Sequence, residues 1–244
     1  MTEQLIPKIM HHIWIGPPMP DHLKANCAAW AEMHPDWDMK LWTEREINEI
    51  GLQNRALYDR AESTVPADAV EQFRADIVRY EVLALFGGMY VDVDTIPLRP
   101  IEPALAGHRE FAAHEDRTWI GNTYLGAIPG HEIMQTLVAG LPANVHRLRG
   151  RRPNKLSGPQ YITPVWNRYG GHIAPQRQFY PYSYIDVKRG TVPEQFAPEV
   201  YAVHTWFHTE SVLRSRKARS LSLWHSLHDR VPLGLMYVFL AVNS

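Results

Sequence analysis

Two aspartates two residues apart, Asp92 and Asp94, are the side chains in this sequence best suited to holding a metal ion. They follow the short apolar run 88–91, and in an extended segment residues i and i+2 point to the same face. Converging carboxylates at a strand end provide the oxygen ligands that Mg²⁺ and Mn²⁺ prefer, often together with substrate phosphate. The alternative is a pair of solvated turn residues, because Asp-x-Asp alone is a weak signal. An EF-hand loop is excluded, since Pro97 and Pro103 stand where Gly and Glu are required.

A second polar set precedes the aspartates. Gln72, Asp76 and Arg79 are spaced so that they share one face of a helix. One interpretation is a donor site, in which the carboxylate accepts hydrogen bonds from sugar hydroxyls and the guanidinium grips a sugar or a phosphate. The other is an exposed Asp–Arg pair that contributes a few tenths of a kcal/mol. The chain reverses at Gly87-Gly88, which allows this helix face and the strand end to meet in a common pocket.

These side chains must be positioned by a regular alternation of helices and strands. The clearest helix spans about 66–86, because an apolar stripe recurs at helical spacing and Gly87 suits the position after its end. A Thr43-x-x-Glu46 capping box starts another helix, and Asp21 is expected to cap an earlier one. Further helices are expected at 131–141 and 159–169, and strands at 9–15, 37–42, 88–91, 111–113, 124–128, 179–185 and 200–204. This alternation predicts an α/β fold with a mostly parallel central sheet flanked by helices, and we expect residues 1–244 to form a single domain.

Composition narrows the class of protein. The chain has 244 residues with 25 Lys+Arg against 26 Asp+Glu, a balance that argues against a nucleic-acid-binding protein. The single cysteine, Cys27, excludes a disulfide within the chain. No secretory signal begins the sequence, and no segment reaches the roughly 18 apolar residues of a membrane span, so we expect a cytoplasmic protein. The uncharged segment 231–242 is expected to close the core; the alternative is a weak peripheral membrane contact.

At this point the motifs resemble those of a known family. Ala75-Asp76-x-x-Arg79-Tyr80 and Gly87-Gly88-Met89-Tyr90-Val91-Asp92-Val93-Asp94 resemble the core of the sugar-binding Asp-x-Asp glycosyltransferases. They look like the motifs of glycosyltransferase family 32, which includes capsular-polysaccharide enzymes and yeast initiating mannosyltransferases, and they resemble clostridial glucosylating toxins more distantly. The opening strand, Ser157-Gly158-Pro159 and His204-Thr205-Trp206 also resemble family landmarks, and the resemblance spans about residues 5–210. One departure is that Glu210-Ser211 stands where many relatives have a Ser-Trp pair.

The resemblance implies a GT-A fold and a retaining, metal-dependent transfer of a hexose in polysaccharide biosynthesis. The donor would be a UDP- or GDP-hexose, and the acceptor a glycan, a lipid-linked sugar or a small molecule. Mn²⁺ or Mg²⁺ would be held by Asp92 and Asp94 with His204 as a third ligand. The catalytic residues would be Asp76, Arg79, Asp92 and Asp94.

Six residues are expected to bind the donor, and several have a structural alternative. They are Trp14, Asp76, Arg79, Tyr90, Asn122 and Ser157. Trp14 would stack on the nucleotide base, but a tryptophan in a buried strand is usually a core residue. Tyr90 could equally be a core residue, Asn122 a turn residue, and Ser157 part of the cap of the helix that begins near Pro159. A histidine at a strand end, such as His204, is also usually structural.

Two other functions remain open from the sequence. The first is a non-catalytic carbohydrate- or nucleotide-sugar-binding module, which the richness in aromatic residues also fits. The second is a glycoside hydrolase, which needs two carboxylates on opposite sides of the scissile bond. The close pair Asp92 and Asp94 suits one metal ion better.

Overall fold

The computed structural model describes residues 5–207, and two sheets organise this part of the chain. The central sheet has the strand order β2-β1-β3-β6-β5-β7, and a second sheet pairs β4 with β8. In the central sheet β6 runs antiparallel to its neighbours β3 and β5, whereas the other pairs are parallel. The expected mostly parallel α/β sheet is therefore confirmed. The strands are β1 (Ile9–Ile13), β2 (Asp38–Trp42), β3 (Gly88–Val91), β4 (Thr95–Pro97), β5 (Glu110–His114), β6 (Ile120–Ala127), β7 (Ile173–Ala174) and β8 (Ala202–His204).

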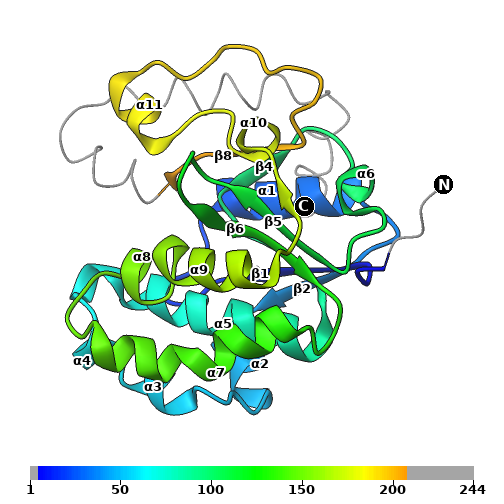
Figure 1. Ribbon diagram of the computed structural model, residues 1–244. Coiled ribbons are helices and arrows are strands. Elements are labelled where there is room, and N and C mark those ends of the chain that lie inside the picture. The colour runs from blue at the N-terminus through cyan, green and yellow to red at the C-terminus, as the bar shows by residue number, and fades with distance from the viewer. Residues whose placement is uncertain (1–4, 208–244) are drawn as a thin grey trace, which may run out of the picture.

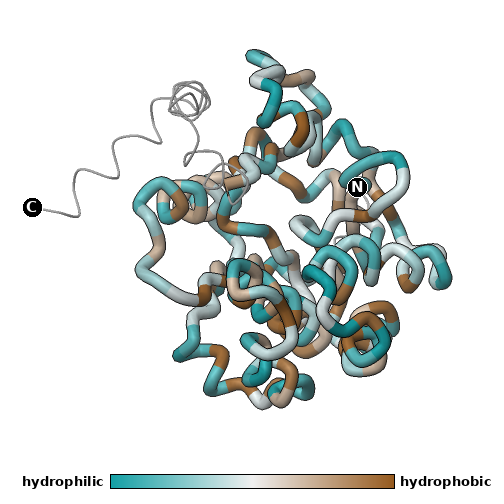
Figure 2. The backbone as a smooth tube through the Cα atoms, turned by 90° about the vertical axis from the view of Figure 1, so that its left-hand side faces the viewer, coloured by the Kyte–Doolittle hydropathy of each residue, from teal (hydrophilic) through white to brown (hydrophobic). Residues whose placement is uncertain are grey.

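Helices cover both faces of the central sheet (Figure 1). The longer helices α5 (Val70–Phe86), α7 (Glu132–Arg147) and α9 (Pro159–Tyr169) pack on one face, and α1 (Asp21–Met33) lies on the other with the β4–β8 pair. One large apolar cluster lies on the α5 side of the sheet, and a second joins α1 to the opposite side. In Figure 2 the outer turns of the chain are mostly hydrophilic, and apolar stretches run through its interior. The shorter helices are α2 (Glu44–Glu49), α3 (Arg55–Asp59), α4 (Ala61–Thr64), the 3₁₀ turn η1 (Ala67–Ala69), α6 (Glu102–Leu105), α8 (Pro153–Leu156), α10 (Gln176–Phe179) and α11 (Tyr184–Arg189).

Helix α5 delivers the chain to the start of β3. Gly87 ends the helix at φ +65°, a left-handed conformation that favours glycine. A Cβ added there would lie 2.8 Å from the carbonyl oxygen of Ala127, so glycine is also required by close packing. The reversal expected from Gly87-Gly88 is confirmed, and β3 follows at once.

Some local expectations were wrong. No strand forms over 179–185; α10 ends at Phe179, and α11 begins after Ser183, whose side chain and that of Asp186 form a capping box. Pro181 lies between the two helices and breaks any regular pairing. Asp21 does not cap α1, since Pro20 is the N-cap and no side chain bonds there. The Thr43–Glu46 capping box of α2 is confirmed.

Within residues 5–207, no helix is long and apolar enough to cross a membrane. The segment 231–242 and the pair Glu210-Ser211 lie outside the described residues. The extent of a single domain over 1–244 stays a prediction.

Candidate metal and donor site

Asp92, Asp94 and His204 come together where β3 passes into β4. Each offers a ligand atom, and these atoms all lie within 4.8 Å of one another. His204 arrives through strand pairing, because β8 pairs with β4 and places His204 opposite Thr95, the residue after Asp94. The sequence expectation of one extended segment was wrong in detail, since β3 ends at Val91 and Val93 and Asp94 form a turn. Two carboxylates and an imidazole are a donor set that fits a divalent cation.

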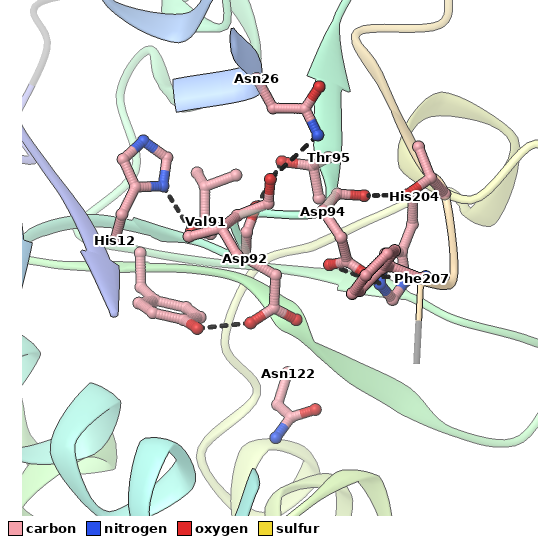
Figure 3. Close-up of polar contacts among 12 residues, drawn as sticks. His12, Asn26, Val91, Asp92, Asp94, Thr95, Asn122, His204 and Phe207 are labelled. Atoms are coloured by element: carbon pink, nitrogen blue, oxygen red, sulfur yellow. Dashed lines mark hydrogen bonds and ion pairs between the residues drawn. The ribbon is translucent and has the colours of Figure 1, made fainter. Parts of the chain in front are cut away.

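Asp94 is directed toward His204 and Asp92 toward Asn122 (Figure 3). The Nε2 atom of His204 lies 3.1 Å from each carboxylate oxygen of Asp94, and the backbone N–H of Phe207 donates to Asp94 Oδ2 at 3.0 Å. Burial alone would lower the pKa of His204, but the Asp94 carboxylate outweighs it and raises the pKa. The other ring nitrogen, Nδ1, is buried without a hydrogen-bond partner.

Arg79 joins helix α5 to the turn that carries Asp92 and Asp94. Its Nη2 atom lies 3.2 Å from an oxygen of Asp76 and 3.2 Å from an oxygen of Asp92. Asp76 and Arg79 are 1% and 4% exposed, so the alternative of a solvated surface pair is wrong. Helix α5 is buried on most of its circumference, which explains why residues off its apolar stripe are also covered. Gln72, by contrast, is exposed and lies outside this cluster.

The charges of this cluster respond to burial in opposite ways. Burial raises the pKa of Asp76 to about 6, although Arg79 and the hydroxyl of Ser157 favour the carboxylate. Burial alone would lower the pKa of Arg79, but the carboxylates of Asp92 and Asp76 outweigh it and raise the pKa. The guanidinium therefore stays charged, and the pKa of Asp76 is higher than that of an ordinary aspartate.

Asn122 and Ser157 hold Asp76 from two directions. The amide nitrogen of Asn122 donates to Asp76 Oδ1 at 2.9 Å, and the hydroxyl of Ser157 donates to Asp76 Oδ2 at 2.6 Å. Ser157 is fully buried, and Gly158 is the N-cap of α9 without a side-chain bond, so the capping alternative for Ser157 was wrong. The backbone oxygen of Asn122 also accepts a bond from Arg79 Nη1 at 2.5 Å. In this structure both residues position the Asp76–Arg79 pair.

Tyr90 and Trp14 occupy different environments. Tyr90 is 1% exposed, its hydroxyl donates to Asp92, and the Arg79 guanidinium carbon lies 4.4 Å from its ring centroid. It is thus a core residue and also a support for the charged pair. Trp14 follows β1, is only partly buried, and its indole N–H donates to the carbonyl of Pro17 at 2.6 Å. The core alternative for Trp14 was therefore wrong, and its ring remains partly accessible.

Side chains that the sequence did not single out hold the backbone of the Asp-x-Asp turn. His12 Nδ1 bonds the carbonyl of Val91 at 2.8 Å, and Asn26 Nδ2 donates to the carbonyl of Val93 at 3.0 Å (Figure 3). Thr205, which directly follows β8, adds its N–H and hydroxyl, which donate to the carbonyl of Asp94 at 2.8 and 2.9 Å. For Asn26 the sequence did contain a signal. It is a polar residue on the face of α1 that also carries the apolar residues Leu23 and Trp30, which indicates a buried, hydrogen-bonded side chain. For His12 and Thr205 only tertiary structure reveals the contact.

Parts of the chain are similar in sequence to known proteins. Residues 20–112 match the family model described as "Glycosyltransferase sugar-binding region containing DXD motif". The chain is 24% identical over 189 residues to inositol phosphoceramide mannosyltransferase 2 of Schizosaccharomyces pombe, covering 77% of this chain and 54% of that protein. It is 25% identical over 215 residues to mannosyl phosphorylinositol ceramide synthase SUR1 of Saccharomyces cerevisiae, covering 83% and 49%. The chain thus spans about half the length of these relatives.

A solved structure supports the fold. The PaToxG glycosyltransferase superposes with a TM-score of 0.55 at 18% identity, covering 67% of this chain and 70% of that chain. The expected GT-A fold is confirmed, with its central sheet flanked by helices. In its motif region, its relatives and its fold, this chain is similar to the Asp-x-Asp glycosyltransferases, whose sugar-binding region residues 20–112 match.

Proposed function

We propose that this protein is a metal-dependent, retaining glycosyltransferase that moves a hexose from a nucleoside diphosphate sugar to a hydroxyl acceptor. The observation that supports this proposal most is the convergence of Asp92, Asp94 and His204 within 4.8 Å, with the buried Asp76–Arg79 pair joined to Asp92. A single cluster then contains groups for a cation, for phosphate and for sugar hydroxyls.

Asp92 and Asp94 would hold Mn²⁺ or Mg²⁺, with His204 as the third ligand. When bound there, the ion would neutralise the negative charge that develops on the leaving nucleoside diphosphate. Arg79 keeps Asp92 oriented through the 3.2 Å ion pair and adds a fixed positive charge to the site. Because Arg79 is held on Tyr90 and Asn122 as well, little reorganisation is needed when the donor binds.

Asp76, Arg79 and Asn122 would recognise the sugar, and Trp14 the nucleotide base. Asp76 is buried in this structure beneath Asn122 and Ser157, so sugar binding there requires these covering side chains to move. Retention requires the acceptor oxygen to bond the anomeric carbon on the face that the diphosphate leaves. In this reaction the bond between the anomeric carbon and the diphosphate oxygen breaks, and its electron pair stays on that oxygen. The leaving phosphate then takes the proton of the acceptor hydroxyl. No side chain is assigned as a nucleophile.

The names of the yeast relatives suggest where to look for substrates. They are mannosyltransferases that act on inositol phosphoceramide, so we propose mannose as the first sugar to test and a lipid-linked or glycan hydroxyl as the acceptor. UDP- and GDP-hexoses are both retained as candidate donors. A cytoplasmic location and a weak peripheral membrane contact stay predictions.

A donor screen tests the proposal. The protein is incubated with Mn²⁺ and a panel of UDP- and GDP-hexoses without acceptor, and release of free nucleoside diphosphate is followed. We expect release with one donor and its loss on adding a chelator. Tight donor binding with no release and no transfer to any acceptor would instead favour a binding module. Chelator-resistant cleavage of glycosides without any nucleotide would favour a glycoside hydrolase.

A further inference from the structure

The turn that carries Asp92 and Asp94 has all four of its backbone carbonyls, from Val91 to Asp94, occupied by hydrogen bonds from other groups of the protein. His12 bonds the carbonyl of Val91, and Asn26 bonds that of Val93. The hydroxyl of Thr95 donates to the carbonyl of Asp92 at 2.6 Å, and the N–H and hydroxyl of Thr205 donate to that of Asp94. These bonds restrain the backbone of the turn, and therefore the directions in which the side chains of Asp92 and Asp94 leave it.

His12 and Asn26 contribute from other elements of the fold. His12 lies on β1, and the pairing of β1 with β3 ends at His11 and Tyr90, one residue before Val91. The His12 ring therefore supplies the hydrogen bond to Val91 at the position where the backbone pairing of β1 with β3 has ended. Asn26 reaches the turn from α1, on the face of the sheet opposite α5. Together they fix the peptide group that precedes Asp92 and the peptide group that precedes Asp94.

The hydrogen bonds to the turn determine the tautomer of His12 and the orientation of the Asn26 amide. A carbonyl can only accept, so His12 carries its proton on Nδ1, and Asn26 presents its amide nitrogen to Val93. Burial lowers the pKa of His12 to about 4, which keeps the ring neutral at neutral pH. His12 Nε2 and Asn26 Oδ1 are both buried without a hydrogen-bond partner. An apolar residue would avoid this burial cost, so each polar side chain is explained by its one bond to the turn.

We infer that His12 and Asn26 are positioning residues that hold the Asp-x-Asp turn in the geometry that binds the metal ion. This inference rests on the proposed metal site and adds two residues that do not touch the ion. Outer residues that orient the ligands of a metal commonly change its affinity by about 10–100-fold when they are replaced. A residue with a merely structural role would change the stability of the protein and leave its metal affinity unaltered.

A second buried histidine and a second buried asparagine provide matched controls. His11 is the adjacent buried histidine of β1, and its Nε2 bonds the carbonyl of Gly87, at the opposite end of β3 from Asp92. Asn54 is a buried asparagine whose amide donates to the carbonyl of Val138 at 2.9 Å, in the other apolar layer. Substituting leucine for either residue removes the same kind of side chain and the same kind of hydrogen bond as in the test variants, but at a site remote from the turn.

The experiment measures Mn²⁺ affinity of the full chain without nucleotide, by the electron paramagnetic resonance signal of free Mn²⁺, together with the thermal unfolding midpoint. We expect His12→Leu and Asn26→Leu to weaken Mn²⁺ binding about 10–100-fold. His12→Asn keeps a donor near the Nδ1 position, and we expect it to recover most of the affinity. The controls His11→Leu and Asn54→Leu are expected to lower the unfolding midpoint with Mn²⁺ affinity unchanged.

Three results separate the possible failures. Wild-type binding that is lost in Asp92→Asn but kept in both His12→Leu and Asn26→Leu would overturn the positioning role and leave the metal site standing. Equal weakening by the control substitutions would also overturn it, because general destabilisation would then explain the loss. Failure of the wild-type chain to bind Mn²⁺ would overturn the proposed metal site and this inference together.

Discussion

The guanidinium of Arg79 lies 3.2 Å from the carboxylate of Asp92, so an ion pair joins helix α5 directly to the turn after β3. These two residues belong to motifs that are separate in the sequence, and in the fold they form one unit. Both partners are largely covered, at 4% and 22% side-chain exposure. Removing one partner of such a pair leaves the other charge poorly compensated, which is why substitutions here are expected to affect both stability and function.

Arg79→Lys tests the role of the guanidinium. The guanidinium contacts Asp76 and Asp92 through Nη2 and the Asn122 carbonyl through Nη1, and an ammonium, with its donors on one nitrogen, cannot reproduce this planar fork. We therefore expect donor affinity to fall roughly ten- to a hundred-fold, as for lost hydrogen bonds to charged groups. Calorimetric titration with the donor identified by the screen measures this loss. The control Arg55→Lys alters an exposed i,i+4 pair with Asp59 and should leave donor binding unchanged. Unchanged donor affinity in Arg79→Lys would show that the site needs only a positive charge there.

Ser157→Ala tests whether this residue acts through Asp76. The substitution removes the 2.6 Å bond to the buried Asp76 carboxylate, and we expect a loss of about 1.5–3 kcal/mol in the free energy of unfolding at pH 8. It also removes a group that favours the charged form, so the pKa of Asp76 should rise further above about 6. Chemical denaturation at pH 8 and at pH 5 measures both effects. A loss of the same size at pH 5, where Asp76 is mostly protonated, would contradict the account.

Trp14→Ala tests the nucleotide-stacking role. Its ring is partly exposed, so we expect a smaller loss of stability than for the fully buried Trp30. Loss of an aromatic stacking partner should weaken binding of free UDP or GDP by about 1–3 kcal/mol, and Trp14→Phe should recover part of this. Calorimetry with the free diphosphate makes the measurement. Wild-type nucleotide affinity in a folded Trp14→Ala protein would exclude the stacking role.

His11 makes stability depend on pH. Its Nε2 bonds the carbonyl of Gly87 and its Nδ1 accepts a bond from Trp42 at 3.0 Å, so the ring is neutral in the folded protein. Burial lowers the pKa of His11 to about 4, below the ordinary value of 6.5. As the pH falls below 6.5 the unfolded chain takes up a proton that the folded protein does not, and stability is lost until the pH reaches about 4. Between pH 7 and pH 5 this costs roughly 2 kcal/mol.

His11→Gln provides the comparison, because glutamine does not titrate in this range. We expect the difference in unfolding free energy between wild type and His11→Gln to shrink by roughly 2 kcal/mol from pH 7 to pH 5. The comparison cancels the opposite contribution of Asp76, whose raised pKa favours folding at lower pH. A difference that stays constant over this range would show that His11 titrates normally in the folded protein.

Much of the fold could be predicted from the sequence because local signals and tertiary structure agree there. The α5 helix, its end at Gly87 and strand β3 follow from the apolar spacing and one glycine. The segment 179–185 misled because its aromatic residues suit a strand, whereas Pro181 and the Ser183–Asp186 capping box determine the structure. The capping pattern was present in the sequence and could have been recognised.

The site was predictable in its residues and only partly in their environment. Helical spacing places Asp76 and Arg79 on one face, but it does not tell that α5 is covered on nearly all sides. The contact of His204 with Asp94 depends on the pairing of β4 with β8, which joins segments more than a hundred residues apart. Such long-range contacts leave no local pattern in a single sequence.

The most direct test of the central claim is Mn²⁺-dependent release of nucleoside diphosphate by wild type, Asp92→Asn and Asp94→Asn. Asp59→Asn, which alters an exposed ion pair, serves as the control. We expect activity in the wild type and the control, its loss with a chelator, and no turnover in either variant at any Mn²⁺ concentration, while circular dichroism shows both variants folded. Near-wild-type turnover in Asp92→Asn or Asp94→Asn, or full wild-type activity in the presence of the chelator, would contradict the claim that these carboxylates hold a catalytic metal ion.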